Sequence, residues 1–413
     1  MLVLLKNQSK ISLNKTGLDN FIHSKLFCYL APFAVLMTYF IPVMAEDRFE
    51  WFDDYYILSH LFNYDRGFMY KGFVGEVISW FTDTVTPGVI KGTMIFGSVM
   101  LLVAGTLCFG AVLSKTRDNR EVHQAAMIII AFLCIAPFTF KPYFVDMKFD
   151  KLFWAIALMA VLLCQKKLGI WFVPVLCMVA TLINPLFLMG SMLLVAIILL
   201  QKCYESGFAV KNIVICAISY IGMIALGVYA ITSQTDIGFE TPYEMAEYYF
   251  KRYSEPIDPA VVEQVSDTFL YEYFEEKNMD FFKKLFEVNF WGWERGKTIA
   301  SNGLLIGVPA VSLFTAFWVK VIKEEKEKFQ KFIFFLCAAT AAFAVAIIPI
   351  AWTLARNLAH NFIVQFGLIL YFLATKNEAV VTVTGRIREF CKNNIVLSAS
   401  VIAYFAIFIG EIY

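Results

Sequence analysis

The chain has 413 residues, of which 59% are hydrophobic and only 17% charged, and its formal net charge is +1. A soluble domain averages about 45–50% apolar and about 25% charged residues, so this composition argues against an ordinary globular protein. The near-zero net charge gives no reason to expect a nucleic-acid partner. The sequence also contains no Walker, Rossmann or zinc-ligand spacing.

The hydrophobic residues lie in runs of 15 to 25 residues separated by short charged connections, which is typical of membrane-spanning helices. We therefore predict an all-α, polytopic transmembrane helix bundle of about eleven spans, organised as one integral membrane domain over residues 1–413. In chain order the predicted spans cover residues 26–45, 89–113, 125–140, 152–164, two segments forming a hairpin around Asn184-Pro185, 212–232, 303–319, 332–350, 358–375 and 395–410. Spans three to six have only about 13 to 16 residues, so we expect some of them to be tilted, broken or re-entrant.

Lysine and arginine residues gather in alternate connections between these spans. Lys6, Lys10, Lys15 and Lys25 precede the first span, and further basic connections follow the second, eighth and tenth. The positive-inside rule places such connections in the cytoplasm, so the N-terminus is predicted inside and the C-terminus outside. No outer N-glycosylation sequon or retention signal occurs, which favours a bacterial inner membrane over the endoplasmic reticulum.

Two long segments, residues 46–88 and 233–302, are predicted to lie on the outer side. Both are rich in aromatic residues, and we expect them to contain short interfacial helices. The opening fifteen residues are not typical of a signal peptide, because their apolar run is too short and no small-residue cleavage site follows the first span. The nine cysteines fall within predicted spans or on the cytoplasmic side, so no disulfide framework is expected.

Asp53 and Asp54 follow the first span and are flanked by aromatic residues. Carboxylates at the mouth of a cavity suit a general base or a divalent-cation ligand, so these two are the predicted catalytic residues. The alternative is a solvated acidic pair that stabilises a helix N-terminus.

Arg66, Lys71 and Glu76 lie in the glycine-rich stretch RGFMYKGFVGE, on a side of the membrane that usually lacks cations. The arginine fork suits phosphate oxygens, and glycine lets the backbone approach a ligand closely. A turn between two interfacial helices, with Lys71 at lipid headgroups, would explain the same residues.

Lys141 and Lys148 belong to a second outer loop, KPYFVDMKFDK, which holds three lysines and two aspartates within eleven residues. A basic site for an anionic headgroup would explain this concentration, and ordinary ion pairing with Asp146 and Asp150 is the alternative. Lys151 is the third lysine of the loop.

Arg356 and His360 are four residues apart at the outer start of the tenth span, so they share one helix face. Ionisable residues at such a boundary usually face a cavity or a partner, although snorkelling to the interface is also common. We expect this region and the first outer loop to share one cavity that binds phosphate.

The outer segment 233–302 carries fourteen acidic and seven basic residues, a net charge of 7 − 14 = −7. Its aromatic residues suit sugar rings as well as a membrane interface. Trp291, Trp293 and Arg295 are therefore candidates for an acceptor groove, with contact to the bilayer as the alternative.

Together these features resemble the GT-C class of multi-span glycosyltransferases and the neighbouring Wzy-like polysaccharide polymerases. The resemblance rests on the acids after the first span, the Arg-Gly element leading into GFVGE, and the late outer Arg356. Thr353, Leu354 and Ala355 stand where the class has the acid and glycine of Asp-x-Gly-Arg.

The resemblance implies glycosyl transfer from a polyprenyl-phosphate or polyprenyl-diphosphate-linked sugar to a glycan acceptor on the outer face. An acid would activate the acceptor hydroxyl, and arginines would stabilise the leaving phosphate. Single transfer and polymerisation both remain open, as do the oligomeric state and any cofactor, for which a divalent cation is the candidate. The competing hypotheses are a transporter or flippase of a lipid-linked or anionic substrate, which predicts ionisable residues deep inside spans, and a non-catalytic membrane scaffold.

Overall fold

The computed structural model describes residues 24–45, 54–68, 72–136, 139–145, 149–184, 187–188, 190–232, 238–269, 307–346 and 354–410. Within these ranges the named secondary-structure elements are all helices, which confirms the all-α prediction. The described residues contain one isolated β-bridge, between Val85 and Tyr253.

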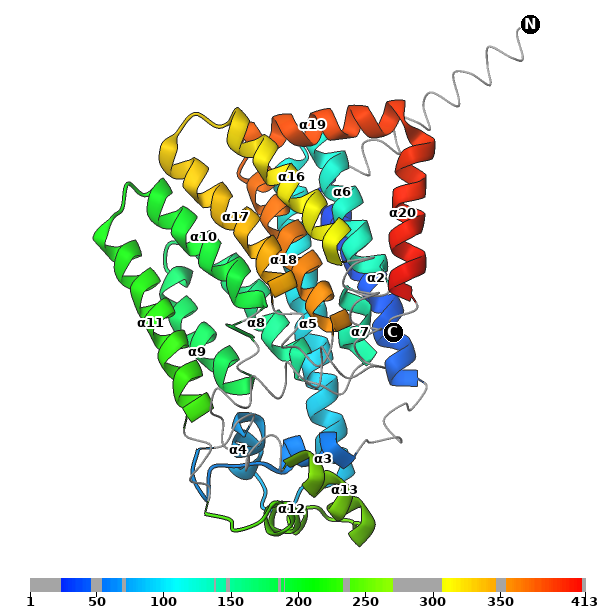
Figure 1. Cartoon of the computed structure of the whole chain (residues 1–413), viewed down its shortest axis with the longest axis vertical. Coiled ribbons are helices and arrows are strands. Elements are labelled where there is room, and N and C mark those ends of the chain that lie inside the picture. The colour runs from blue at the N-terminus through cyan, green and yellow to red at the C-terminus, as the bar shows by residue number, and fades with distance from the viewer. Residues whose placement is uncertain are drawn as a thin grey trace, which may run out of the picture.

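Among the described residues, eleven helices form the main bundle (Figure 1). They are α2 (Lys25–Ala45), α5 (Pro87–Thr116), α6 (Arg120–Ile135), α8 (Asp150–Cys164), α9 (Val173–Ile183), α10 (Ser191–Glu205), α11 (Val210–Thr232), α16 (Val308–Glu324), α17 (Lys328–Ala346), α18 (Leu354–Ala374) and α20 (Ile395–Gly410). The short α7 (Phe140–Val145) and the 3₁₀ turn η2 (Gly169–Phe172) lie between consecutive bundle helices.

The centre of the bundle is built around α5 and α8, because α5 packs on α2, α8 and α18 while α8 also packs on α9 and α10. Local sequence signals set the helix starts. Thr86 caps α5 by accepting from the Val89 backbone N–H, and Pro87 occupies the first turn, where its missing N–H costs nothing. Asn119 caps α6 in the same way.

Each predicted span overlaps one bundle helix, but few of these helices are long enough to cross a bilayer by themselves. Among the described residues, three helical segments have the length and hydropathy of a span, at Lys25–Pro42, Pro87–Thr116 and Val210–Tyr229. A fourth is added if α18 and the helix that follows it count as one bent span. The predicted number of about eleven is therefore larger than length and composition support. Several other helices have only 11 to 17 residues, which is short for a hydrocarbon core about 30 Å thick.

One end of the bundle, here called the basic end, carries the connections 117–119, 165–168, 206–209, 325–327 and 375–377 (top of Figure 1). Across it runs α19 (Glu378–Asn393), bent by 113° from α18. From the sequence this stretch is predicted to be a basic loop. It is a helix because Asn377 caps it, and because Arg386 and Arg388 bind Glu324 of α16 and Glu121 of α6.

The opposite end carries four short helices, here called the cap: α3 (Asp54–Leu61), α4 (Phe73–Ser79), α12 (Pro242–Phe250) and α13 (Pro259–Phe269) (bottom of Figure 1). They belong to the predicted outer segments 46–88 and 233–302, whose position at the membrane interface stays a prediction. The two segments are joined by main-chain hydrogen bonds from Val85 to Arg252 (2.7 Å) and from Ser254 to Val85 (3.0 Å). The Arg252 guanidinium also donates to the Leu61 carbonyl.

Candidate functional site

Two ionisable residues are buried where α8 begins, directly under the cap. Asp150 and Lys151 are the first two residues of this otherwise apolar helix, and they are only 1% and 2% exposed. His360, from the second turn of α18, is 6% exposed, and its Nε2 lies 4.0 Å from Asp150 Oδ2. Burying a charge is costly unless it is paired, so a protein rarely retains such a group without a use for it. We call Asp150, Lys151 and His360 the buried cluster.

Lys151 is held against α5. Its Nζ donates to Ser98 Oγ at 3.3 Å, and its aliphatic stem crosses the helix at Gly97. A Cβ at Gly97 would lie 2.9 Å from Cγ and Cδ of the lysine, so glycine is what lets the side chain pass. The ammonium is thereby fixed inside the bundle, away from bulk water.

Aromatic rings surround the His360 imidazole. Its ring centroid lies 5.4 Å from that of Trp154, 5.6 Å from Phe153 and 5.8 Å from Tyr143. On another side Gly190 approaches so closely that a Cβ there would be 2.2 Å from His360 Nδ1. The imidazole therefore has little freedom to rotate.

Further polar atoms next to the buried cluster have no hydrogen-bond partner among the described residues. They are both amide atoms of Asn361, Trp154 Nε1 and Ser191 Oγ. Buried polar groups in native structures are nearly always paired, so each such atom calls for an explanation. Hydrogen bonds to a bound polar molecule would supply one.

The cap closes over the buried cluster through His60. This residue ends the last turn of α3 and is fully buried, with its ring 4.7 Å from the ring of Phe149, which immediately precedes Asp150. His60 of the first outer loop and His360 of α18 thus lie on either side of the start of α8, and the predicted cavity shared by the two regions stays a prediction. The predicted meeting of Arg66 with Arg356 is a separate matter, because the Arg356 side chain lies outside the described residues.

Three predicted site residues contact other groups. Arg66 is exposed, and its guanidinium lies 5.1 Å and 5.8 Å from the ring centroids of Tyr248 and Phe239, as in a cation–π contact. The ammonium of Lys141 lies 6.0 Å from the centroid of Tyr39. These contacts join elements of the protein to one another, so the phosphate-binding role of both cations stays a prediction.

Glu76, the third of these residues, caps part of the first outer loop. Its carboxylate accepts from the Tyr64 backbone N–H at 2.9 Å and from Trp80 Nε1 at 3.0 Å. Burial, and next the nearby Glu76 carboxylate, raises the pKa of Tyr64 far above its usual value, so the phenol stays neutral. The preceding glycine, Gly75, serves packing: a Cβ there would lie 1.9 Å from the Phe62 carbonyl oxygen. The sequence suggests that glycine here lets the backbone approach a ligand. In the structure, Gly75 instead lets α4 approach the end of α3.

The remaining predicted residues are not placed by the structure. Asp54 starts α3 and Arg356 lies one turn before His360 in α18, but their side chains fall outside the described residues. The others lie wholly outside them: Asp53, Lys71, Lys148, Trp291, Trp293 and Arg295.

The described residues contain neither a cluster of metal-binding side chains nor a disulfide bond. Within the described ranges, no three His, Cys, Asp or Glu side chains gather in a way that would hold a metal ion. The divalent cation therefore stays a prediction tied to Asp53 and Asp54. All nine cysteines are free, and eight of them are buried as small apolar residues.

Comparison with protein-family models, with curated proteins and with solved structures finds no match for this chain. The functional argument consequently rests on the residues of the buried cluster and on the helices that hold them.

Proposed function

We propose that the chain is an integral membrane protein of a bacterial inner membrane, with the basic end in the cytoplasm and the cap outside. The charge pattern supports this orientation, and the long apolar helices α2, α5 and α11 support insertion. Large apolar side chains also cover the outer surface of the bundle, with Phe96, Ile128 and Ile221 each more than half exposed. Such a surface suits lipid rather than water.

Within that membrane protein, we propose that the buried cluster is the reaction centre of a GT-C-like glycosyltransferase or glycan polymerase. A single observation carries the proposal: a carboxylate, an ammonium and an imidazole are buried together under an aromatic-rich cap at the outer end. A polyprenyl-phosphate or polyprenyl-diphosphate-linked sugar supplies an anionic leaving group, and the cap offers stacked rings such as Tyr64 and Phe68 to a sugar.

The proposed reaction needs one base and one source of positive charge. Asp150 accepts the proton of the acceptor hydroxyl, whose oxygen bonds to the anomeric carbon of the donor. The bond from that carbon to the phosphate oxygen breaks, and its electron pair leaves with the phosphate. Lys151, together with His360 when it is protonated, stabilises the developing anion. Asp53 and Asp54 remain the alternative bases, and Arg356 an additional cation on the helix of His360.

The test compares Asp150→Asn with Asp83→Asn, a control acid that is exposed at the same end of the molecule. Glycan output and lipid-linked sugars extracted from cells are measured by gel and mass spectrometry at matched membrane levels of each variant. Loss of a positioned base lowers the rate by ~10²–10⁴-fold, so Asp150→Asn should accumulate lipid-linked donor while Asp83→Asn behaves as wild type. Normal glycan output from Asp150→Asn would remove Asp150 from the reaction.

A transporter of an anionic or lipid-linked substrate is the second candidate. The burial of Asp150, Lys151 and His360 favours it too. Transporters place ionisable residues inside the bundle, and an apolar slot lined by Ile363 reaches to within one turn of His360. The two functions differ in what they produce. If the protein is a transporter, the wild type moves substrate across the membrane of sealed vesicles and forms no glycosidic bond, and Asp150→Asn loses that movement.

A further inference from the structure

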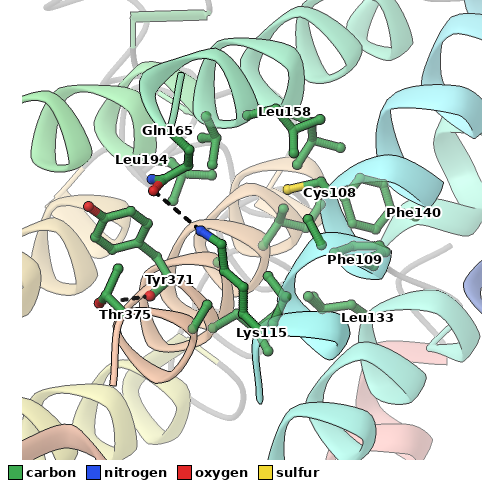
Figure 2. A pocket seen from close by; sticks show the side chains of 18 residues that line it. Cys108, Phe109, Lys115, Leu133, Phe140, Leu158, Gln165, Leu194, Tyr371 and Thr375 are labelled. Carbon is green, nitrogen blue, oxygen red and sulfur yellow. Dashed lines mark hydrogen bonds between the residues drawn. The ribbon is translucent and has the colours of Figure 1, made fainter. Parts of the chain in front are cut away.

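A long apolar slot runs between α5, α8, α10 and α18, apart from the buried cluster (Figure 2). Its cavity volume is about 60 Å³, counted as the space in which the centre of a water-sized sphere fits. At the basic end its lining includes Lys115, which is exposed, and Thr375, which is half-buried. At the far end it includes Phe140 and Ile363, which are fully buried. The slot therefore opens at the basic end and is closed toward the cap.

The depth of the slot matches one leaflet of a bilayer. Its lining on α18 extends from Ile363 to Thr375, which is 12 residues or about 18 Å at ~1.5 Å per residue. Half of a hydrocarbon core about 30 Å thick is about 15 Å. Nearly every side chain that lines the slot between Ile363 and its mouth is apolar. The slot therefore suits an aliphatic chain better than a polar ligand.

The mouth of the slot is positively charged. Lys115 Nζ donates to Gln165 Oε1 at 3.5 Å, a hydrogen bond drawn as a dashed line in Figure 2, and Lys202, Lys166 and Glu205 are among the groups whose charge acts on this ammonium. Glu205 is already engaged with Lys202 at 2.6 Å. Three lysines thus face one carboxylate, which leaves a surplus of positive charge where the headgroup of a lipid would lie.

We infer that the slot holds one acyl chain of an anionic glycerophospholipid from the leaflet at the basic end, with the lipid phosphate against Lys115. The inference rests on the membrane insertion proposed above, and it adds a lipid site on the face opposite to the proposed reaction centre. The bound chain would pack between α5, α8 and α18, the three helices that position Ser98, Lys151 and His360. An anionic lipid should therefore stabilise the bundle.

The test uses the full-length protein purified in a non-ionic detergent, with phosphatidylglycerol and phosphatidylcholine of identical acyl chains as probes. Native mass spectrometry measures the lipid retained, and thermal unfolding measures the change in Tm. The wild type should retain phosphatidylglycerol roughly tenfold more than phosphatidylcholine and show a higher Tm with it. Lys115→Gln should bring the two lipids close to equal retention.

A second pair of variants tests the slot itself. Ala111→Phe fills it from α5 and should abolish retention of both lipids, whereas Leu107→Phe, at an exposed position one turn earlier, should leave retention unchanged. Ala374→Phe fills the slot from α18 and replaces Ala111→Phe if that variant does not fold. Equal binding of the two lipids by the wild type, or full phosphatidylglycerol retention by a folded slot-filling variant, overturns the inference. Absence of the wild type from the membrane fraction would instead overturn the proposed insertion.

Discussion

At the scale of single residues, the buried cluster depends on where the His360 ring is held. Gly190 Cα approaches the imidazole closely, and the ring also contacts Trp154 and Phe153. Asp150 also lies beside the ring, with its Oδ2 4.0 Å from His360 Nε2. Any group added at Gly190 must push the imidazole toward these neighbours or away from the carboxylate.

We predict that Gly190→Ala displaces His360 and impairs function. The new Cβ would lie 2.2 Å from Nδ1, so the ring or the backbone must shift, and such overpacking costs about 1–3 kcal/mol of stability. The matched control is Gly92→Ala in α5, where a Cβ meets no atom within 4 Å and where alanine should stabilise the helix by roughly 0.5–1 kcal/mol. Thermal unfolding in detergent and glycan output in cells measure the two effects. Equal behaviour of the two variants would show that the His360 position is not constrained.

The sequence predicts part of this site. His360 is found because it shares a helix face with Arg356 at a predicted membrane boundary. Asp150 and Lys151 are noted only as charges of an outer loop, since their burial depends on α5 and α18, which are distant in sequence. His60 is passed over because one histidine among aromatic residues gives no local signal. An acid and a base opening a wholly apolar helix is the pattern that would have pointed to Asp150 and Lys151.

At the scale of helices, a close backbone contact joins α3 and α4 within the cap. Gly75 of α4 lies against the carbonyl groups of Phe62 and His60. His60 is also the residue through which the cap covers the buried cluster. Backbone atoms cannot rotate away as side chains do. The position of α4 and the position of His60 are therefore linked.

We predict that Gly75→Ala loosens the cap while leaving the bundle folded. A Cβ would lie 1.9 Å from the Phe62 carbonyl oxygen, so α3 and α4 must separate. Gly88→Ala is the control, because its Cβ would meet only Thr86 Oγ1 at an ordinary 3.6 Å. Trypsin added to spheroplasts should cleave the cap faster in Gly75→Ala than in the control, with a parallel fall in glycan output. An unchanged cleavage rate would show that α4 is not needed to hold α3.

Helices are more predictable here than their relation to a membrane. Each predicted span falls on a helix because apolar periodicity and caps such as Thr86 and Asn119 are local signals. The helix α19 is missed because its polar residues resemble a loop, and only contacts with α6 and α16 show otherwise. The number of spans is overestimated relative to helix length, since a short apolar helix packed inside a bundle has the same sequence pattern as a short span.

At the scale of the whole molecule, the two ends differ in character. The basic end combines α19 with the lysine- and arginine-bearing connections, whereas the cap end combines α3 and α4 with α12 and α13, which belong to the acidic segment 233–302 (Figure 1). A bundle that spans a bilayer with this polarity must present the two ends to opposite compartments. The transferase hypothesis needs the cap outside, whereas a transporter needs only that the bundle separates two compartments and a scaffold needs neither.

We predict opposite locations for reporters fused at Lys326, between α16 and α17, and at Ser266, in α13. Lysine-rich connections are retained in the cytoplasm, so a fluorescent protein that folds only there should be bright at Lys326 and dark at Ser266. Alkaline phosphatase, which is active only outside, should give the reverse pattern, and a fusion after Gly410 should resemble Ser266. A matched variant, with Lys320, Lys323 and Lys326 changed to Gln, should weaken the retention of the first reporter. If Lys326 and Ser266 report the same side, the bundle does not separate two compartments, and the outer reaction centre and the lipid slot lose their common basis.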